Sequence, residues 1–173
     1  QRVFEFGAGM STRVILDALD ETGGELVSCS TDSRLHVANT AGIRVIERMR
    51  WTHLEGLSIN TRAGLRGCPV DLILHDGAHD RETVIDDLRE VMPALIRFGL
   101  VLIHDTQHEH CGSSMRLAAS TIAHEFGLSH VTLPYGYGLT IMRRETGGEP
   151  IDGRAFDKIG GRFRTEPSML EGA

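Results

Sequence analysis

The sequence predicts an α/β protein: a doubly wound, mostly parallel sheet of seven strands with helices on both faces and the last strand antiparallel. Three observations predict it. Short apolar runs alternate with amphipathic stretches along most of the chain. A glycine turn, Gly7-Ala8-Gly9, separates the first apolar run from the first amphipathic stretch. Ionisable residues directly follow several apolar runs, as at the carboxyl edge of an open sheet, where ligands bind.

The first half of the chain contains three of these strands. Residues 3–6 form the first, and the helix-capping residues Ser11 and Thr12 lead into a helix that ends at Gly23-Gly24. That helix carries Val14, Ile15, Ala18 and Leu19. The elements expected next are strand 25–30, helix 36–49 and strand 51–59.

The second half repeats the alternation. Residues 70–74 form a strand, and a helix follows from Arg81, with a kink or a restart expected at Pro93. Apolar residues recur in that helix at helical spacing and are expected in the core: Val84, Leu88, Val91 and Leu95. The remaining elements are strand 100–103, helix 114–126 and an antiparallel pair, 130–133 with 138–142.

A chain of 173 residues is long enough for one domain with a sizeable core. We expect this domain to span residues 1–144, because the composition shifts afterwards to Gly, Glu and Arg. Residues 145–173 are expected to form a tail, lid or contact arm, with disorder as the alternative.

Charge and cysteine content restrict the partners. Eighteen basic and 24 acidic residues give a net charge of −6, which argues against a nucleic-acid partner. No apolar run approaches the roughly 20 residues of a membrane span, so no membrane partner is expected. Three cysteines without a paired framework fit a cytoplasmic protein.

Four markers fall at predicted strand ends and converge on one edge of the sheet: Gly7, Asp32, Asp76 and Asp105. Asp32 suits the hydroxyls of a ribose. A dinucleotide fingerprint needs a third glycine where this chain has Thr12, which disfavours NAD. Glu5 stands inside an apolar strand, where a carboxylate needs a partner, and a ligand ammonium group would supply one.

The segment Glu5-Phe6-Gly7-Ala8-Gly9 resembles the E-x-G-x-G motif of class I S-adenosylmethionine-dependent methyltransferases, and Asp32 matches their acidic residue after the second strand. The resemblance implies a Rossmann-like methyltransferase fold and S-adenosylmethionine as cofactor. The cofactor-binding residues it implies are Glu5, Gly7, Gly9, Ser11, Asp32, Leu57, Ser58 and Asp76, of which Leu57 and Ser58 would lie near the adenine.

A second motif is more specific. The segments 74–80 and 102–105 are similar to the I-D-G-x-H … H-D pattern of a branch that includes sugar O-methyltransferases and cephalosporin-hydroxylase-like proteins, over residues 3–143. In some members the matching carboxylates hold Mg²⁺ and the matching histidine is a base, which implies these roles for Asp76, Asp105 and His79. His104 stands where metal-binding members have Glu, so the expected metal site is Asp76, His104 and Asp105. An imidazole ligand shifts the preference toward Mn, Fe or Zn.

The expected reaction is O-methylation of a small-molecule hydroxyl on a sugar or natural product, with His79 and Asp76 as catalytic residues. A helix beginning near His79 favours the neutral imidazole, by about 0.3–1 kcal/mol at an exposed site. The alternatives are a purely capping role for His79 and Asp80, an NAD-dependent oxidoreductase, and a non-catalytic nucleotide-binding or assembly protein. A homo-oligomer, in which another chain covers the site, also stays open.

Overall fold

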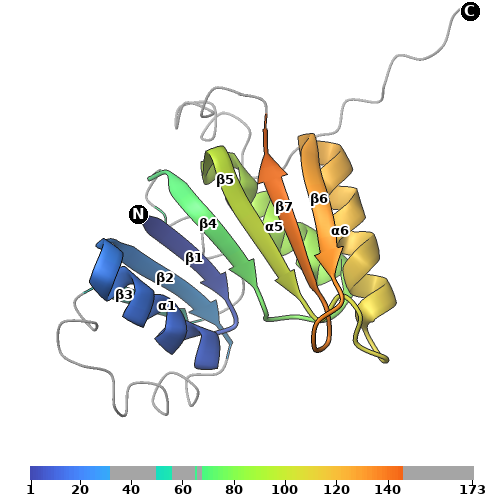
Figure 1. The fold of residues 1–173 in the computed structure, drawn as a ribbon, viewed down its shortest axis with the longest axis horizontal. Helices are drawn as coiled ribbons and strands as arrows, with labels where there is room; N and C mark the ends of the chain where they lie inside the picture. Colours follow the sequence, from blue (N-terminus) through green and yellow to red (C-terminus); the bar gives the residue numbers. More distant parts are fainter. Residues whose placement is uncertain (32–49, 56–64, 66–67, 146–173) are drawn as a thin grey trace, which may run out of the picture.

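A computed structural model describes residues 1–31, 50–55, 65 and 68–145. It contains a seven-stranded sheet in the order β3-β2-β1-β4-β5-β7-β6 (Figure 1). Only β7 runs antiparallel to its neighbours, β5 and β6, so the predicted fold class is confirmed. The strands are β1 Arg2–Phe6, β2 Glu25–Ser30, β3 Trp51–Glu55, β4 Val70–His75, β5 Leu95–His104, β6 Leu128–Leu133 and β7 Leu139–Arg144.

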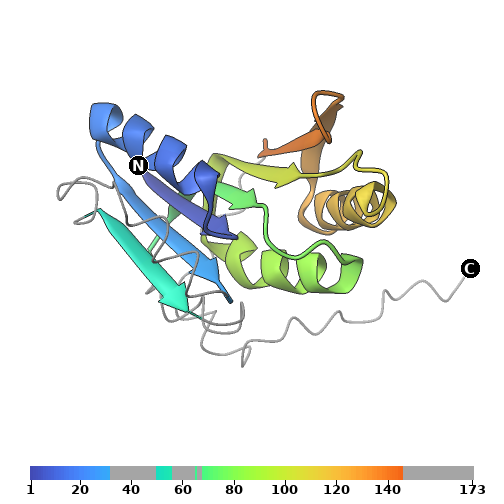
Figure 2. The same ribbon diagram turned by 90° about the horizontal axis from the view of Figure 1, so that it is seen from below.

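Helices lie on both faces of the sheet. Helix α1 (Met10–Thr22) covers one face, whereas α5 (Arg81–Val91) and α6 (Gly112–Phe126) pack side by side on the other (Figure 2). The larger core lies between the sheet and the α5–α6 layer, and the predicted core residues Val84, Leu88, Val91 and Leu95 are fully buried in it. A smaller core lies beneath α1 and contains Val3, Leu16, Leu19 and Leu26.

The first turn of α1 differs from the prediction. Its N-cap is Gly9, so Ser11 and Thr12 lie inside the helix rather than before it. The helix buries Leu16 and Leu19, whereas Val14 is 68% exposed. Thr12 is fully buried, and its hydroxyl donates a hydrogen bond to the carboxylate of Glu5 below the helix.

The boundary between α5 and β5 also differs. The predicted helix was expected to include Leu95, but α5 ends at Val91 and a 3-10 turn, η2 (Met92–Ala94), contains Pro93. Proline has no backbone N–H to donate to a continuing helix, so the α-helix ends before Pro93. Leu95 pairs with Val70 and becomes the first residue of β5.

Several predictions lie outside the described residues: helix 36–49, the end of the third strand, Asp32, Leu57, Ser58 and the tail beyond Glu145. No helix among the described residues combines the length and apolar character that crossing a membrane requires.

Candidate active site

Glu5 is fully buried at the middle of the sheet, beneath the first turn of α1. Ser11 donates a hydrogen bond of 2.7 Å to Oε1 of Glu5, and Thr12 and Ser28 each donate one of 2.7 Å to Oε2. The network extends to Trp51, whose indole Nε1 donates to the hydroxyl of Ser28 at 3.0 Å. Three hydroxyl groups of the chain therefore satisfy the carboxylate, without the ligand ammonium group expected from the sequence.

Burial raises the pKa of the Glu5 carboxyl, and the hydrogen bonds from the three hydroxyls oppose that rise. The hydroxyl of Thr12 also accepts a hydrogen bond of 2.9 Å from the backbone N–H of Gly9. Glu5 thus holds the start of α1 against β1, and the shape of the glycine turn depends on this network. The sequence indicated a buried charge at Glu5 but not its partners, because Ser28 lies on a different strand and Ser11 and Thr12 were expected to cap the helix.

Gly7 is the residue at which β1 turns toward α1. Its φ is +87°, and a Cβ there would lie 2.2 Å from the backbone oxygen of Asp76. The two backbones are also joined through Phe6, whose carbonyl accepts a hydrogen bond of 3.0 Å from the N–H of Asp76. The absence of a side chain at Gly7 therefore brings the loop after β4 directly against the glycine turn.

Gly9, unlike Gly7, has open space where a side chain would lie. A Cβ added there would meet no atom of the described residues within 4 Å. The residue is the N-cap of α1, where backbone N–H groups of the first turn lack helical partners and favour an anionic or polar ligand. Gly9 therefore leaves open space where a ligand can approach the backbone closely.

Asp76, His104 and Asp105 come together at the carboxyl ends of β4 and β5, as expected. Nδ1 of His104 lies 3.2 Å from Oδ1 of Asp76 and 3.0 Å from Oδ1 of Asp105. One ligand atom of each residue lies within 4.8 Å of the other two, so the group could hold a metal ion. Nδ1 of His104 and Oδ1 of Asp105 are both buried, and their 3.0 Å contact does not have hydrogen-bond geometry.

A backbone turn makes this arrangement possible. Consecutive residues of a strand point to opposite faces, which would separate the side chains of His104 and Asp105. Strand β5 ends at His104, and Asp105 adopts a φ of +58°, a conformation that side-chain-bearing residues rarely take. The turn brings the carboxylate of Asp105 beside His104, and such strain clusters at functional sites.

His79 lies in the loop between β4 and α5, and its Nε2 is 3.0 Å from Oδ2 of Asp105. The side chain of His79 is 43% exposed, whereas that of Asp105 is only 13% exposed. The helix cap is Asp80, whose carboxylate accepts a hydrogen bond from the backbone N–H of Thr83. Asp80 therefore performs the capping role, and His79 presents its ring to solvent beside a buried carboxylate.

Burial raises the pKa of the Asp76 carboxyl. The rings of His104 and His79 oppose this rise, whereas the nearby Asp105 carboxylate adds to it. Two carboxyl groups near one another in a partly buried site favour a bound proton or a cation between them.

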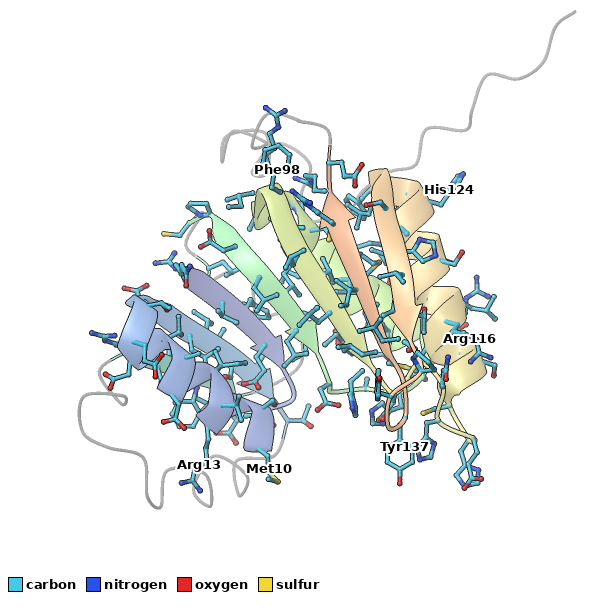
Figure 3. All side chains as sticks on the ribbon, in the orientation of Figure 1. Met10, Arg13, Phe98, Arg116, His124 and Tyr137 are labelled. Atoms are coloured by element: carbon cyan, nitrogen blue, oxygen red, sulfur yellow. The ribbon has the colours of Figure 1, made fainter. Side chains whose placement is uncertain are left out.

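Exposed side chains at the same edge were not identified from the sequence. Figure 3 shows Met10 and Tyr137 at the edge where β1, β4 and β5 end, with Phe98 at the opposite edge. Tyr137 is 58% exposed, and its ring lies 4.6 Å from that of His108. Its carbonyl accepts a hydrogen bond of 2.6 Å from the N–H of Gln107, which holds the β6–β7 turn against the loop after Asp105. The aromatic contact of Tyr137 with His108 depends on the packing of these two loops, which the sequence does not predict.

A second pair of a histidine and a carboxylate was also not predicted from the sequence. His75, the last residue of β4, is fully buried, and its Nε2 lies 3.1 Å from Oδ2 of Asp87 in α5. Asp87 occupies a position on the buried side of α5, among apolar residues. The pair joins β4 to α5 directly behind Asp76 and is buried away from the open edge.

Comparisons with known proteins agree with this geometry. Residues 4–106, more than half of the chain, match the family model described as a methyltransferase domain. No curated protein matches the sequence.

Solved structures share the fold. A candidate caffeoyl-CoA O-methyltransferase from Staphylococcus aureus is similar at a TM-score of 0.69 and 12% identity, with 83% of this chain and 76% of that chain covered. The SAH-bound methyltransferase PaMTH1 from Podospora anserina is similar at a TM-score of 0.67 and 18% identity, with 84% of this chain and 72% of that chain covered. The cofactor-bound protein Rv0187 from MTB is similar at the same TM-score of 0.67 and 18% identity, with 84% of this chain and 73% of that chain covered.

The family match favours S-adenosylmethionine over the nicotinamide alternative, as does the occupation of the third glycine position by the buried Thr12. With its motif, sheet order and glycine turn in agreement, the chain belongs to the methyltransferase-domain family and is a class I S-adenosylmethionine-dependent methyltransferase.

Proposed function

We propose that this methyltransferase transfers the methyl group to a hydroxyl oxygen of a small molecule, a sugar or a natural product, with His79 as the general base. The observation that carries the proposal is the 3.0 Å contact between Nε2 of His79 and Oδ2 of Asp105. A base held by a buried carboxylate beside an open ligand edge is the arrangement that deprotonation of an alcohol requires.

The contact with Asp105 determines which nitrogen would act. An ionised carboxylate has no proton to donate, so we infer that neutral His79 carries its ring proton on Nε2, the nitrogen that faces Asp105. Nδ1 then holds the lone pair that takes the proton of the acceptor hydroxyl. Asp105 stabilises the imidazolium that results and fixes the ring orientation, which makes it a positioning residue for His79.

The glycine turn supports binding of the methyl donor. S-adenosylmethionine supplies a methyl group on a sulfonium; the acceptor oxygen forms a bond to the methyl carbon, the sulfur–carbon bond breaks, and the hydroxyl proton goes to His79. Gly9 leaves space for the donor next to the backbone, and Glu5 and Ser11 hold the turn. Asp76 borders the turn through its backbone contact with Gly7. Asp32, Leu57 and Ser58 are proposed to complete the cofactor site.

A divalent cation fits the group formed by Asp76, His104 and Asp105. Two carboxylates and one imidazole lie within reach of one ion, and the buried contact between Nδ1 of His104 and Oδ1 of Asp105 does not have hydrogen-bond geometry. A cation bound there would lower the pKa of an acceptor hydroxyl. The nitrogen ligand favours Mn²⁺ or another transition ion over Mg²⁺.

The exposed aromatic side chains support a sugar or another ring as acceptor. Tyr135 and Tyr137 are 83% and 58% exposed, and Tyr137 lies beside His108 in the loop that follows Asp105. Aromatic faces of this kind provide apolar contact area with few rotatable bonds, while the hydroxyls of a sugar remain free to reach His79.

The test is transfer of a labelled methyl group from S-adenosylmethionine to a panel of glycosides and phenols. Matched analogues carry an amine in place of each hydroxyl. We expect methylation of at least one hydroxyl compound, loss of product with its amine analogue, and loss of product with His79→Ala. Equal methylation of the amine analogue, or full activity of His79→Ala, would contradict O-methylation by this base. Binding of S-adenosylhomocysteine with no turnover on any acceptor would favour the non-catalytic alternative.

A further inference from the structure

Cys111 lies next to the His79–Asp105 pair. The ligand atoms of His79, Asp105 and Cys111 all lie within 4.8 Å of one another. They come from three separate segments: the loop before α5, the turn after β5 and the N-cap position of α6. Cys111 is a free, half-buried thiol. This group shares Asp105 with the Asp76–His104–Asp105 group, but its other two ligands, His79 and Cys111, are different residues.

Asp105 has the geometry of a ligand that two ions could share. The residue is 9% exposed, so its carboxylate is largely removed from water. Oδ2 faces His79, whereas Oδ1 faces His104. Burial of an ionised carboxylate is costly, and a cation bound on the Oδ2 side would offset that cost.

The chemistry of the three donors selects the ion. Mg²⁺ and Ca²⁺ prefer oxygen ligands, whereas a thiolate, an imidazole and a carboxylate are the ligands of Zn²⁺ in proteins. A protein that supplies three ligands leaves the fourth tetrahedral position to water or a ligand. Small side-chain rotations must bring the three atoms closer, because zinc lies about 2.0–2.3 Å from such atoms.

We propose that His79, Asp105 and Cys111 form a Zn²⁺ site, and that Zn²⁺ bound there inhibits the methyltransferase. The inhibition rests on the proposed role of His79 as base, whereas the binding does not. Zn²⁺ binds the thiolate form of cysteine, so the thiol proton of Cys111 leaves to solvent when the cation binds.

Inhibition follows from the two nitrogens of the ring. In the proposed mechanism without Zn²⁺, Nε2 of His79 faces Asp105 and carries the ring proton, and Nδ1 holds the lone pair. Zn²⁺ takes a lone pair at Nε2, so the single proton of the neutral imidazole moves to Nδ1. Neither nitrogen can then accept the proton of the acceptor hydroxyl, and the base is blocked.

The binding test uses Co²⁺ as a spectroscopic substitute for Zn²⁺ on the intact chain. A cobalt–thiolate bond gives a charge-transfer absorption band that oxygen and nitrogen ligands do not give. We expect this band in the parent protein and in Cys68→Ser, and its loss in Cys111→Ser and on addition of excess Zn²⁺. Serine is a favourable helix cap, so Cys111→Ser is expected to fold. Absence of the band from the parent protein, or its persistence in Cys111→Ser, would overturn the site.

The inhibition test compares Zn²⁺ titrations of turnover in the parent protein and Cys111→Ser. Cys111 takes no part in the proposed proton transfer, so both proteins are expected to be equally active without Zn²⁺. We expect Cys111→Ser to need at least about tenfold more Zn²⁺ for half-inhibition, which is about 1.4 kcal/mol of binding free energy. Equal sensitivity would overturn the inhibitory role. Failure of the proposed O-methylation would appear as a lack of turnover in both proteins, with the cobalt band unchanged.

Discussion

Nε2 of His79 and Oδ2 of Asp105 lie 3.0 Å apart, although one residue follows β4 and the other follows β5. Strands β4 and β5 pair in parallel, so their carboxyl ends open at the same edge of the sheet. The turn at Asp105 then directs its carboxylate toward the exposed ring of His79. This contact joins the partly exposed ring of His79 to a largely buried carboxylate.

Replacement of His79 by Ala is expected to lower kcat by about 10²–10⁴-fold, the usual contribution of a general base. The affinity for S-adenosylhomocysteine is expected to change by less than about twofold, because the glycine turn is left intact. The matched control is His110→Ala, whose side chain is 81% exposed and pairs only with Glu109 among the ion pairs of the described residues. Turnover and calorimetric titration measure the two effects. Equal kcat values for the two variants would remove His79 from the mechanism.

Gly7 and Gly9 are expected to respond differently to alanine. Gly7→Ala places a Cβ against the Asp76 backbone at a φ of +87°, so it should lower the free energy of unfolding by at least about 2 kcal/mol. Gly9→Ala meets open space and should change it by less than about 1 kcal/mol. Gly9→Ala should nevertheless weaken S-adenosylhomocysteine at least about tenfold, because the ligand is proposed to occupy that space. Urea unfolding and calorimetry check both results; unchanged affinity would place the ligand elsewhere.

Glu5 is expected to make stability depend on pH. Burial raises its folded-state pKa above the ordinary value of 4.5, so its contribution to stability is fully present below pH 4.5 and is lost as pH rises through the folded-state pKa. Glu5→Gln removes this titration. Above pH 4.5 the parent should lose up to about 1.4 kcal/mol per pH unit relative to Glu5→Gln until the folded-state pKa is passed. Urea unfolding across pH 4–8 measures it, and parallel curves would contradict the raised pKa.

The metal group is expected to respond to loss of one carboxylate. Asp76→Asn should lower the affinity for Mn²⁺ at least about tenfold, because it removes a charged ligand. Asp86→Asn in α5, where the Asp86 side chain is 75% exposed, should leave that affinity unchanged. Electron paramagnetic resonance of free Mn²⁺ gives both affinities. Similar affinities in the two variants would contradict a site at Asp76.

The buried pair of His75 and Asp87 is expected to contribute stability rather than activity. Asp87→Ala leaves the buried Nε2 of His75 without its partner and should cost about 1–3 kcal/mol. The double variant His75→Phe with Asp87→Leu should lose less free energy of unfolding than the sum of the losses in His75→Phe alone and Asp87→Leu alone. Both polar groups are removed together, so neither is left buried without a partner. Affinity for S-adenosylhomocysteine should stay constant in stable variants. A large loss of affinity would show that the pair positions Asp76.

The succession of strands and helices along the chain is predicted well from the sequence, because the signals for these elements are local. Apolar runs bounded by glycine gave β2 at residues 25–30 as observed, and periodic Val84, Leu88 and Val91 gave the buried side of α5. Leu95 satisfied the same periodicity but belongs to β5, because its pairing with Val70 is a tertiary contact that periodicity does not encode.

The candidate site divides in the same way. Motif spacing identified Asp76, His79, His104 and Asp105, but the φ of +58° that brings the last two side chains together has no local signal in the sequence. The partners of Glu5, the neighbours of Cys111 and the pair formed by His75 and Asp87 join segments distant in sequence. Those contacts depend on sheet order and loop packing, so they required the structure.

The most direct test of the account is a crystal structure with S-adenosylhomocysteine and Mn²⁺, with anomalous diffraction locating the metal. The account predicts the ligand against the Gly7–Gly9 turn, its sulfur facing the His79–Asp105 pair, and an anomalous peak bounded by Asp76, His104 and Asp105. A ligand bound away from the turn, or a site edge closed by the protein's own side chains, would contradict it.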